Sequence, residues 1–154
     1  MSGQNVGNSS LSVSNSGLLS VNNAGMIERC SATISNALYT DSFGMIAYKN
    51  SDKITDCWSY VSATGNKLSI SGKAAGIART NTGTISNCFF RGSFRTQRTD
   101  YAIAENSGGN IKNCYYRNAN GDSNGEVYID GNKDTGDTVV WKSTSACASG
   151  EVAW

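Results

Sequence analysis

The chain has 154 residues, a formal net charge of +1 and neither histidine nor proline. The absence of histidine excludes Ser-His-Asp and Cys-His nucleophile pairs and histidine-ligated zinc. Gly, Asn and Ser make up more than a third of the residues, yet the small net charge and the 38% hydrophobic content favour one folded domain over a disordered segment.

The first residues show neither a targeting signal nor a membrane span. No apolar run approaches the roughly 18 residues that a membrane helix needs. Residues 1–25 lack the basic and apolar regions of a signal peptide. Residues 1–16, in which Leu11 and Val13 alternate with Ser, are expected to form an N-terminal cap or a partial coil.

Between residues 17 and 118 the chain repeats one pattern four times. When aligned on cysteine, the segments are residues 20–30, 47–57, 78–88 and 104–114. Each begins with a small residue and has isoleucine three residues before its cysteine. The cysteines are 27, 31 and 26 residues apart, a period that is typical of solenoids.

The residues inside each repeat indicate strands rather than helices. Short β-branched or aromatic runs alternate with Asn-Gly, Ser-Gly and Thr-Gly turn signals. We therefore predict an all-β fold, a right-handed parallel β-solenoid of about four to five coils with a cap at each end. Asn23, Asn50, Asn81 and Ser107 are expected at one corner, because asparagine tolerates positive φ at low cost.

Two columns of inward side chains are expected to stack from coil to coil, about 4.8 Å apart. They are the isoleucines Ile27, Ile54, Ile85 and Ile111 and the cysteines Cys30, Cys57, Cys88 and Cys114. The cysteine column is interpreted as a row of buried thiols, with a metal or redox array as the alternative. Cys147 lies outside the column.

An aromatic residue follows three of the four cysteines. Successive strand residues face opposite sides, so inward cysteines would place Trp58, Phe89 and Tyr115 in an outer stripe. Such a stripe could stack on sugar rings or dock a protein. The alternative is cross-strand stacking that only stabilises the sheet.

Basic residues accompany this stripe. Residues 57–99 contain six basic side chains and no acidic one, and Arg91, Arg95 and Arg98 lie near the aromatic positions in sequence. These arginines favour an anionic glycan as the ligand; the alternative is a solvated loop. Nucleic acid is not expected as a partner, because the isoelectric point of about 7.6 gives no basic field.

Residues 119–154 leave the repeat register and are expected to form a C-terminal cap. Asp130, Asn132, Asp134 and Asp137 resemble half of a calcium loop, with an ordinary polar turn as the alternative. No other cofactor is expected. Catalysis is not expected either, because the only carboxylate pair within the repeats, Asp52 and Asp56, has no counterpart in the other coils.

The segment Gly76-Ile-Ala-Arg-Thr-Asn-Thr-Gly-Thr-Ile-Ser-Asn-Cys-Phe89 resembles the GLUG-motif repeats of large bacterial surface proteins and adhesins. The ending, Asn113-Cys-Tyr-Tyr116 and later Ala148-Ser-Gly-Glu-Val-Ala-Trp154, is similar to the segment that often follows the last such repeat, so the resemblance covers roughly residues 17–154. Arg29 and Asp56 depart from it, because that corner usually carries Asn.

The resemblance implies a non-catalytic module of a longer secreted or surface-exposed protein. Such a module would act as an adhesive or as a structural spacer, with a glycan, a host protein or a neighbouring surface protein as its partner and no insertion into membranes. One alternative is a self-assembling filament or fibre subunit, including the fibre or spike of a phage. Another is a fragment of a polysaccharide-degrading β-helix enzyme.

Overall fold

The computed structural model describes residues 11–34, 38–61, 68–92, 101–117 and 139–141, and every helix or strand assigned in these ranges is a β-strand. The strands of these ranges pair in parallel and form five sheets. The prediction of an all-β fold with parallel strands is therefore confirmed. The described residues contain no helix long and apolar enough to span a bilayer.

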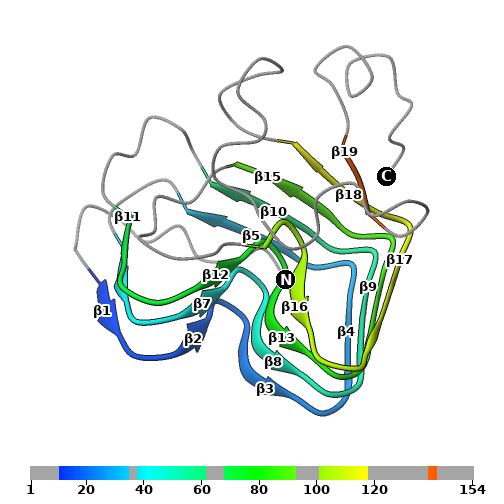
Figure 1. Ribbon diagram of the computed structural model, residues 1–154, viewed down its shortest axis with the longest axis horizontal. Helices are drawn as coiled ribbons and strands as arrows, with labels where there is room; N and C mark the ends of the chain where they lie inside the picture. The colour runs from blue at the N-terminus through cyan, green and yellow to red at the C-terminus, as the bar shows by residue number, and fades with distance from the viewer. Residues whose placement is uncertain (1–10, 35–37, 62–67, 93–100, 118–138, 142–154) are drawn as a thin grey trace.

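The chain visits the five sheets in one order three times, and its next three strands then add one strand each to the third, fourth and fifth sheets (Figure 1). The first two sheets consist of β1 (Leu11–Val13), β6 (Leu38–Thr40) and β11 (Leu68–Ile70), and of β2 (Ser16–Gly17), β7 (Phe43–Gly44) and β12 (Ala74–Ala75). The third consists of β3 (Ser20–Asn23), β8 (Ala47–Asn50), β13 (Ala78–Asn81) and β16 (Ala104–Asn106). The fourth consists of β4 (Met26–Glu28), β9 (Lys53–Thr55), β14 (Thr84–Ser86) and β17 (Asn110–Lys112).

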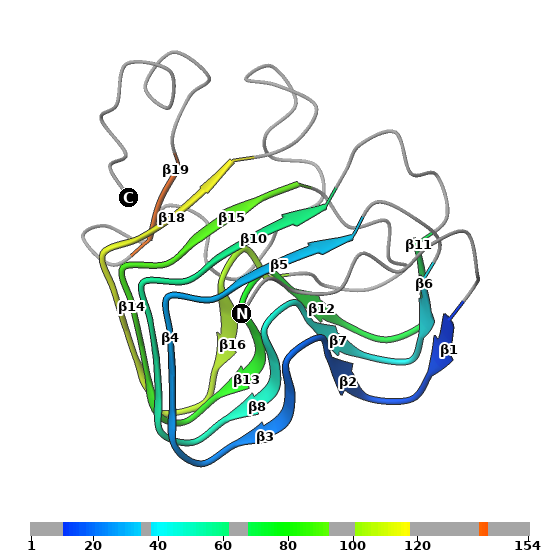
Figure 2. The same ribbon diagram turned by 180° about the vertical axis from the view of Figure 1, so that it is seen from behind.

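The fifth sheet is called the aromatic sheet below. It consists of β5 (Ser31–Ile34), β10 (Trp58–Val61), β15 (Phe89–Arg91), β18 (Cys114–Arg117) and β19 (Val139–Trp141). Figure 2 shows its strands lying side by side from β5 to β19, while β3, β8, β13 and β16 follow one another in the third sheet. Each circuit of the chain through the sheets, called a pass below, thus lies against the preceding one.

The isoleucine column sets the register of the fourth sheet. Ile27 pairs with Ile54, Ile54 with Ile85, and Ile85 with Ile111. Ile54 and Ile85 are completely buried, and the hydrophobic core runs through the passes beside them. Branched apolar side chains at one inward position per pass fill this core.

Asparagine occupies the first corner, which is the turn between the third and fourth sheets, for a reason other than the one predicted. Asn23, Asn50 and Asn81 lie at the ends of strands, have negative φ and point their amides inward. The amide nitrogen of Asn23 donates to the side-chain oxygen of Asn50 at 2.7 Å, and that of Asn50 donates to Asn81 at 2.7 Å. A ladder of buried amides therefore holds the passes together, since each amide satisfies its neighbour.

In the fourth pass the ladder residue is Asn106, and the placement of Ser107 at this corner is wrong. Asn81 pairs with Asn106 in the sheet, and its amide donates to the Asn106 oxygen at 3.0 Å. The register shifts within β13 and β16, so that β16 reaches the corner one residue early. Gly108, at φ +94°, lies in the turn that restores the register at Asn110.

Residues with positive φ lie instead at the second corner, which is the turn between the fourth sheet and the aromatic sheet, directly before each cysteine. Arg29, Asp56, Asn87 and Asn113 have φ between +51° and +54°. The amide of Asn87 donates to the carboxylate of Asp56 at 2.9 Å, and that of Asn113 donates to Asn87 at 3.3 Å. Asn and Asp adopt this conformation more readily than other non-glycine residues, so Arg29 is the exception.

The regions expected to be caps are described only in part. β1 pairs with β6 and β2 with β7, so residues 11–17 already follow the sheet order of the repeats. β11, in the insert between the second and third repeats, adds a further strand beside β6. Of the C-terminal segment, β19 pairs with β18. Residues 1–10, 118–138 and 142–154 lie outside the described residues.

Candidate functional site

Side chains of β10 alternate between the core and the outer surface. Cys57, Ser59 and Val61 are buried, whereas Trp58 is 41% exposed and Tyr60 is half-buried. Trp58 and Tyr60 therefore belong to the outer face of the aromatic sheet. A Ser59 hydroxyl that donates to the carbonyl of Gly76 holds the inner side of the strand across the core.

The parallel register brings the outward residues of adjacent strands together. Trp58 pairs with Phe89, and Tyr60 pairs with Arg91. Phe89 in turn pairs with Tyr115 on β18. The three aromatic residues predicted from the sequence as an outer stripe, Trp58, Phe89 and Tyr115, thus occupy one line across three strands. Phe89, the middle residue of this line, is only 9% exposed.

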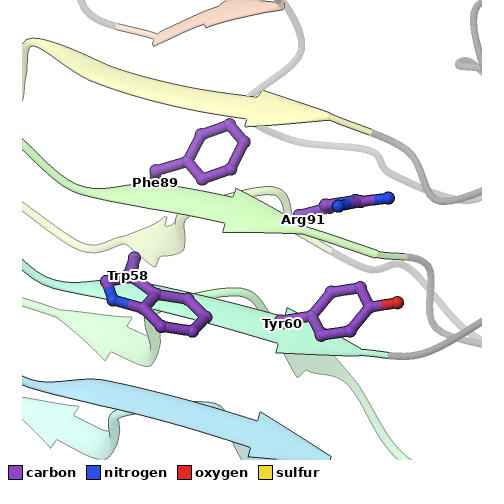
Figure 3. A pocket seen from close by; sticks show the side chains of 4 residues that line it. All are labelled: Trp58, Tyr60, Phe89 and Arg91. Carbon is purple, nitrogen blue, oxygen red and sulfur yellow. The ribbon is translucent and has the colours of Figure 1, made fainter. Parts of the chain in front are cut away.

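Four of these side chains line a pocket of about 390 Å³ on the outer face. Trp58 and Tyr60 come from β10, and Phe89 and Arg91 come from β15 (Figure 3). The guanidinium carbon of Arg91 lies 5.1 Å from the centroid of the Tyr60 ring, which is the distance of a cation–π contact. The pocket therefore combines flat apolar rings with one positive charge.

The aromatic sheet carries positive but no negative side chains. Its five strands contain Arg91 and Arg117, and neither Asp nor Glu. Arg117 occupies the register position next to Arg91. Within the described ranges, Arg91 has no ion pair with a carboxylate. The cation–π contact with Tyr60 leaves the charge of Arg91 in place.

A second charged cluster lies at the junction of the second and third sheets, and here the charges are paired. The ammonium of Lys73 lies 2.6 Å from a carboxylate oxygen of Glu105, and Arg79 pairs with the other oxygen. The hydroxyl of Tyr101 also donates to Glu105 at 2.9 Å. Burial opposes ionisation of Glu105, but these three donors outweigh it and lower its pKa to about 2. This cluster therefore joins Lys73, which directly precedes β12, to β13 and β16.

The cysteines stack inside the protein. Cys57, Cys88 and Cys114 are buried and Cys30 is half-buried, and all four are free thiols. The thiol of Cys57 donates to the carbonyl of Thr55 at 3.1 Å, and the thiols of the next two passes repeat this contact. Hydrogen bonding with Cys114 and Cys57, together with burial, raises the pKa of Cys88.

Several residues predicted as sites lie outside the described residues. They are Arg95 and Arg98 of the proposed ligand-binding set, the calcium candidates Asp130, Asn132, Asp134 and Asp137, and Cys147. In the part of the chain that the structure describes, no three His, Cys, Asp or Glu side chains group as metal ligands.

Sequence reasoning missed one wall of the pocket, Tyr60. Its signal was the two-residue alternation of β10, since Tyr60 follows Trp58 by two and must share its face. Alignment on cysteine hid it, because the equivalent positions carry Thr33 and Arg91. The charged cluster around Glu105 was also missed, because it depends on how three strands meet in space.

Comparisons of the chain with protein-family models, with curated proteins and with solved structures give no match.

Proposed function

We propose that the chain is a non-catalytic, right-handed parallel β-solenoid module that binds carbohydrate on the outer face of its aromatic sheet. The repeated order of the sheets and the register of the isoleucine column support a solenoid. Right-handed crossovers are the rule between parallel strands. With the GLUG-like sequence pattern, this architecture fits an adhesive or spacer module of a longer, surface-exposed or secreted protein.

The observation that carries the proposal is the pocket formed by Trp58, Tyr60, Phe89 and Arg91. An exposed indole offers a flat apolar surface to the C–H face of a sugar ring, and a nearby cation offers hydrogen bonds to its oxygens. The register of β10 and β15 sets the backbone positions of these residues, which lowers the cost of ordering them on binding.

The carboxylates of the repeats support binding rather than catalysis. Asp52 and Asp56 are both exposed, and Asp56 accepts a hydrogen bond from the Asn87 amide at the second corner. Glu105 is held as a carboxylate by two cations in the charged cluster. None of these acids lines the aromatic pocket.

A glycan array probed with the purified chain and two variants tests the proposal. Trp58→Ala removes the exposed ring of the pocket, and Tyr48→Ala removes a half-buried ring from β8 of the third sheet as a matched control. We expect the wild type and Y48A to bind the same glycans and W58A to lose them. Binding that survives in W58A, or the absence of any bound glycan, would contradict the proposal.

End-to-end self-assembly is the second candidate function. β3 and β4 stand at the ends of the strand orders of their sheets. They carry Val21 at 52% exposure and Met26 at 61% exposure. Exposed apolar side chains on such an edge favour association with a second copy of the chain.

Sedimentation velocity at increasing protein concentration tests this candidate. Wild-type chain should form larger species, and the double variant V21K/M26K should remain monomeric because two charges protect the edge. A wild-type chain that stays monomeric at millimolar concentration would rule self-assembly out.

A further inference from the structure

The pocket also indicates the chemical class of its ligand, an inference that rests on the proposed carbohydrate binding. We infer that the aromatic sheet binds acidic sugars, with the apolar face of a pyranose on Trp58 and the sugar carboxylate on Arg91. Three features of the pocket support this assignment: the contact of the arginine, the backbone spacing of the two residues and the charge of the surrounding sheet.

Arg91 is positioned by a contact that does not itself neutralise its charge. Its guanidinium lies over the ring of Tyr60, and within the described residues no carboxylate pairs with it. One cation–π contact leaves most of the five N–H donors of a guanidinium for other partners. That planar edge matches the two oxygens of a carboxylate and forms paired, charge-assisted hydrogen bonds with them.

Trp58 and Arg91 lie diagonally across two adjacent strands. Trp58 pairs with Phe89, and Arg91 follows Phe89 by two residues on the same face. The spacing between strands and the rise along a strand place such a diagonal pair roughly 8 Å apart. A pyranose ring with an exocyclic carboxylate spans this separation, with its ring on the indole and its acid group at the guanidinium.

The next strand repeats the arrangement. Tyr115 and Arg117 on β18 pair with Phe89 and Arg91 on β15. An aromatic residue two positions before an arginine therefore occurs on two successive strands. The two arginine positions are register partners on adjacent strands, whose backbones lie about 4.8 Å apart. This spacing suits a ligand whose acid groups recur along a chain. We thus expect an acidic oligosaccharide to bind more tightly than a single acidic sugar.

The charge of the whole chain favours a sugar acid over a nucleic acid. Nucleic-acid affinity depends on many phosphate contacts and an extended basic surface. This chain has a net charge of only +1, and its positive positions in the aromatic sheet are Arg91 and Arg117. Two arginine positions in one sheet match carboxylates spaced along a sugar backbone better than the many closely spaced phosphates of a nucleic acid.

Calorimetric titration with a matched pair of sugars tests the inference. The probes are tetragalacturonate and the same oligosaccharide after chemical reduction of its carboxyl groups. We expect the acidic form to bind at least about tenfold more tightly, which corresponds to one charge-assisted contact. Galacturonate monomer should bind more weakly than the tetramer, and added salt should weaken the binding of the acidic form.

Two Arg91 variants and one control complete the design. Arg91→Ala should lose the preference for the acidic form, and Arg91→Lys should lose most of it because lysine keeps the charge but not the planar fork. Lys112→Ala, which removes an exposed cation from β17 of the fourth sheet, should leave both affinities within about twofold. Circular dichroism of each variant checks that the strands remain folded.

The outcomes separate this inference from the proposed function. Equal affinity for the acidic and reduced sugars would overturn acid recognition and leave carbohydrate binding standing. Binding of neither sugar, together with an empty glycan array, would overturn both. Tighter binding of a single-stranded DNA tetramer than of tetragalacturonate would also overturn the inference, because it would make phosphate and base stacking the recognised features.

Discussion

Arg91 lies over the ring of Tyr60 on the neighbouring strand, with its guanidinium carbon 5.1 Å from the ring centroid. The two residues are direct partners in the parallel register of β10 and β15. The contact restricts the orientation of the arginine without consuming its charge. A ligand that pairs with Arg91 therefore meets a group that is already positioned.

Removal of the Tyr60 ring should weaken acidic-sugar binding even though Arg91 is retained. Tyr60→Leu should raise the Kd for tetragalacturonate about three- to fivefold, the value of a partly exposed cation–π contact. Tyr60→Phe keeps the ring and should bind like the wild type. Calorimetric titration of both variants with tetragalacturonate measures this difference. Equal Kd values for Y60L and Y60F would show that the Tyr60 ring does not position Arg91 for binding.

Replacement of Arg29 should stabilise the fold. Arg29 has φ +52°, whereas the equivalent residues of the later passes are Asp56, Asn87 and Asn113. Arg29→Asn should raise the free energy of unfolding by roughly 1 kcal/mol, because asparagine tolerates the left-handed conformation better. The corresponding rise in Tm is about 2–4 °C in a differential scanning calorimeter.

The exposed pair between Arg29 and Glu28, at 3.7 Å, contributes little to stability. Glu28→Gln serves as its control and should leave the Tm unchanged. A lower Tm for R29N than for the wild type would contradict the argument from backbone strain.

The amide ladder should be the most sensitive polar feature of the interior. Asn50 is 1% exposed, accepts a hydrogen bond from Asn23 and donates one to Asn81. Asn50→Ala leaves one N–H of the Asn23 amide and the side-chain oxygen of Asn81 without the partner that Asn50 supplied, and should cost about 2–4 kcal/mol in urea unfolding. Asn22→Ala, at an exposed position of β3, should change stability by less than about 0.5 kcal/mol. A similar loss of unfolding free energy in N50A and N22A would mean that the amide ladder does not contribute to stability.

Acid should destabilise the protein through Glu105. Burial opposes its ionisation, yet Lys73, Arg79 and Tyr101 lower its pKa from 4.5 to about 2. The folded pKa lies below the unfolded one, so this stabilisation is present above pH 4.5 and is lost as the pH falls towards 2. After allowance for partial exposure of the cluster it amounts to roughly 1–3 kcal/mol.

Urea unfolding of the wild type and of Glu105→Gln across pH 2 to 7 measures this contribution. The variant should be less stable at pH 7, and the two proteins should converge near pH 2. Asp52→Asn, which changes an exposed acid, is the control. A constant difference between wild type and E105Q at every pH would refute the role given to the Glu105 carboxylate.

The spacing of residues in the sequence was sufficient to predict those parts of the structure that repeat once per pass. The isoleucine three residues before each cysteine predicted the pairing of Ile54 with Ile85, and strand alternation predicted a common face for Trp58 and Phe89. The ladder made by Asn50 was misread, because asparagine is favoured both by positive φ and by amide stacking. The sequence does not distinguish these two causes.

Features that depend on contacts between unlike positions could not be predicted. The pairing of Lys73 and Arg79 with Glu105 requires β12, β13 and β16 to meet at one junction. The place of Asn106 in the ladder depends on a shift of register between β13 and β16 at Ala78 and Thr80. This irregularity moves the residues up to Asn106 by one position, and alignment on the cysteines conceals it because the register is regained at Asn110.

Tryptophan side-chain NMR tests the central claim most directly. Protein labelled with ¹⁵N at its three tryptophans gives one indole N–H signal for each, and a spectrum of Trp58→Phe identifies the signal of Trp58. Upon titration with tetragalacturonate, the Trp58 signal should move in a saturable manner, and Arg91→Ala should greatly reduce the shift. If tetragalacturonate binds while the Trp58 signal stays in place, the sugar is bound elsewhere and the aromatic sheet is not the binding site.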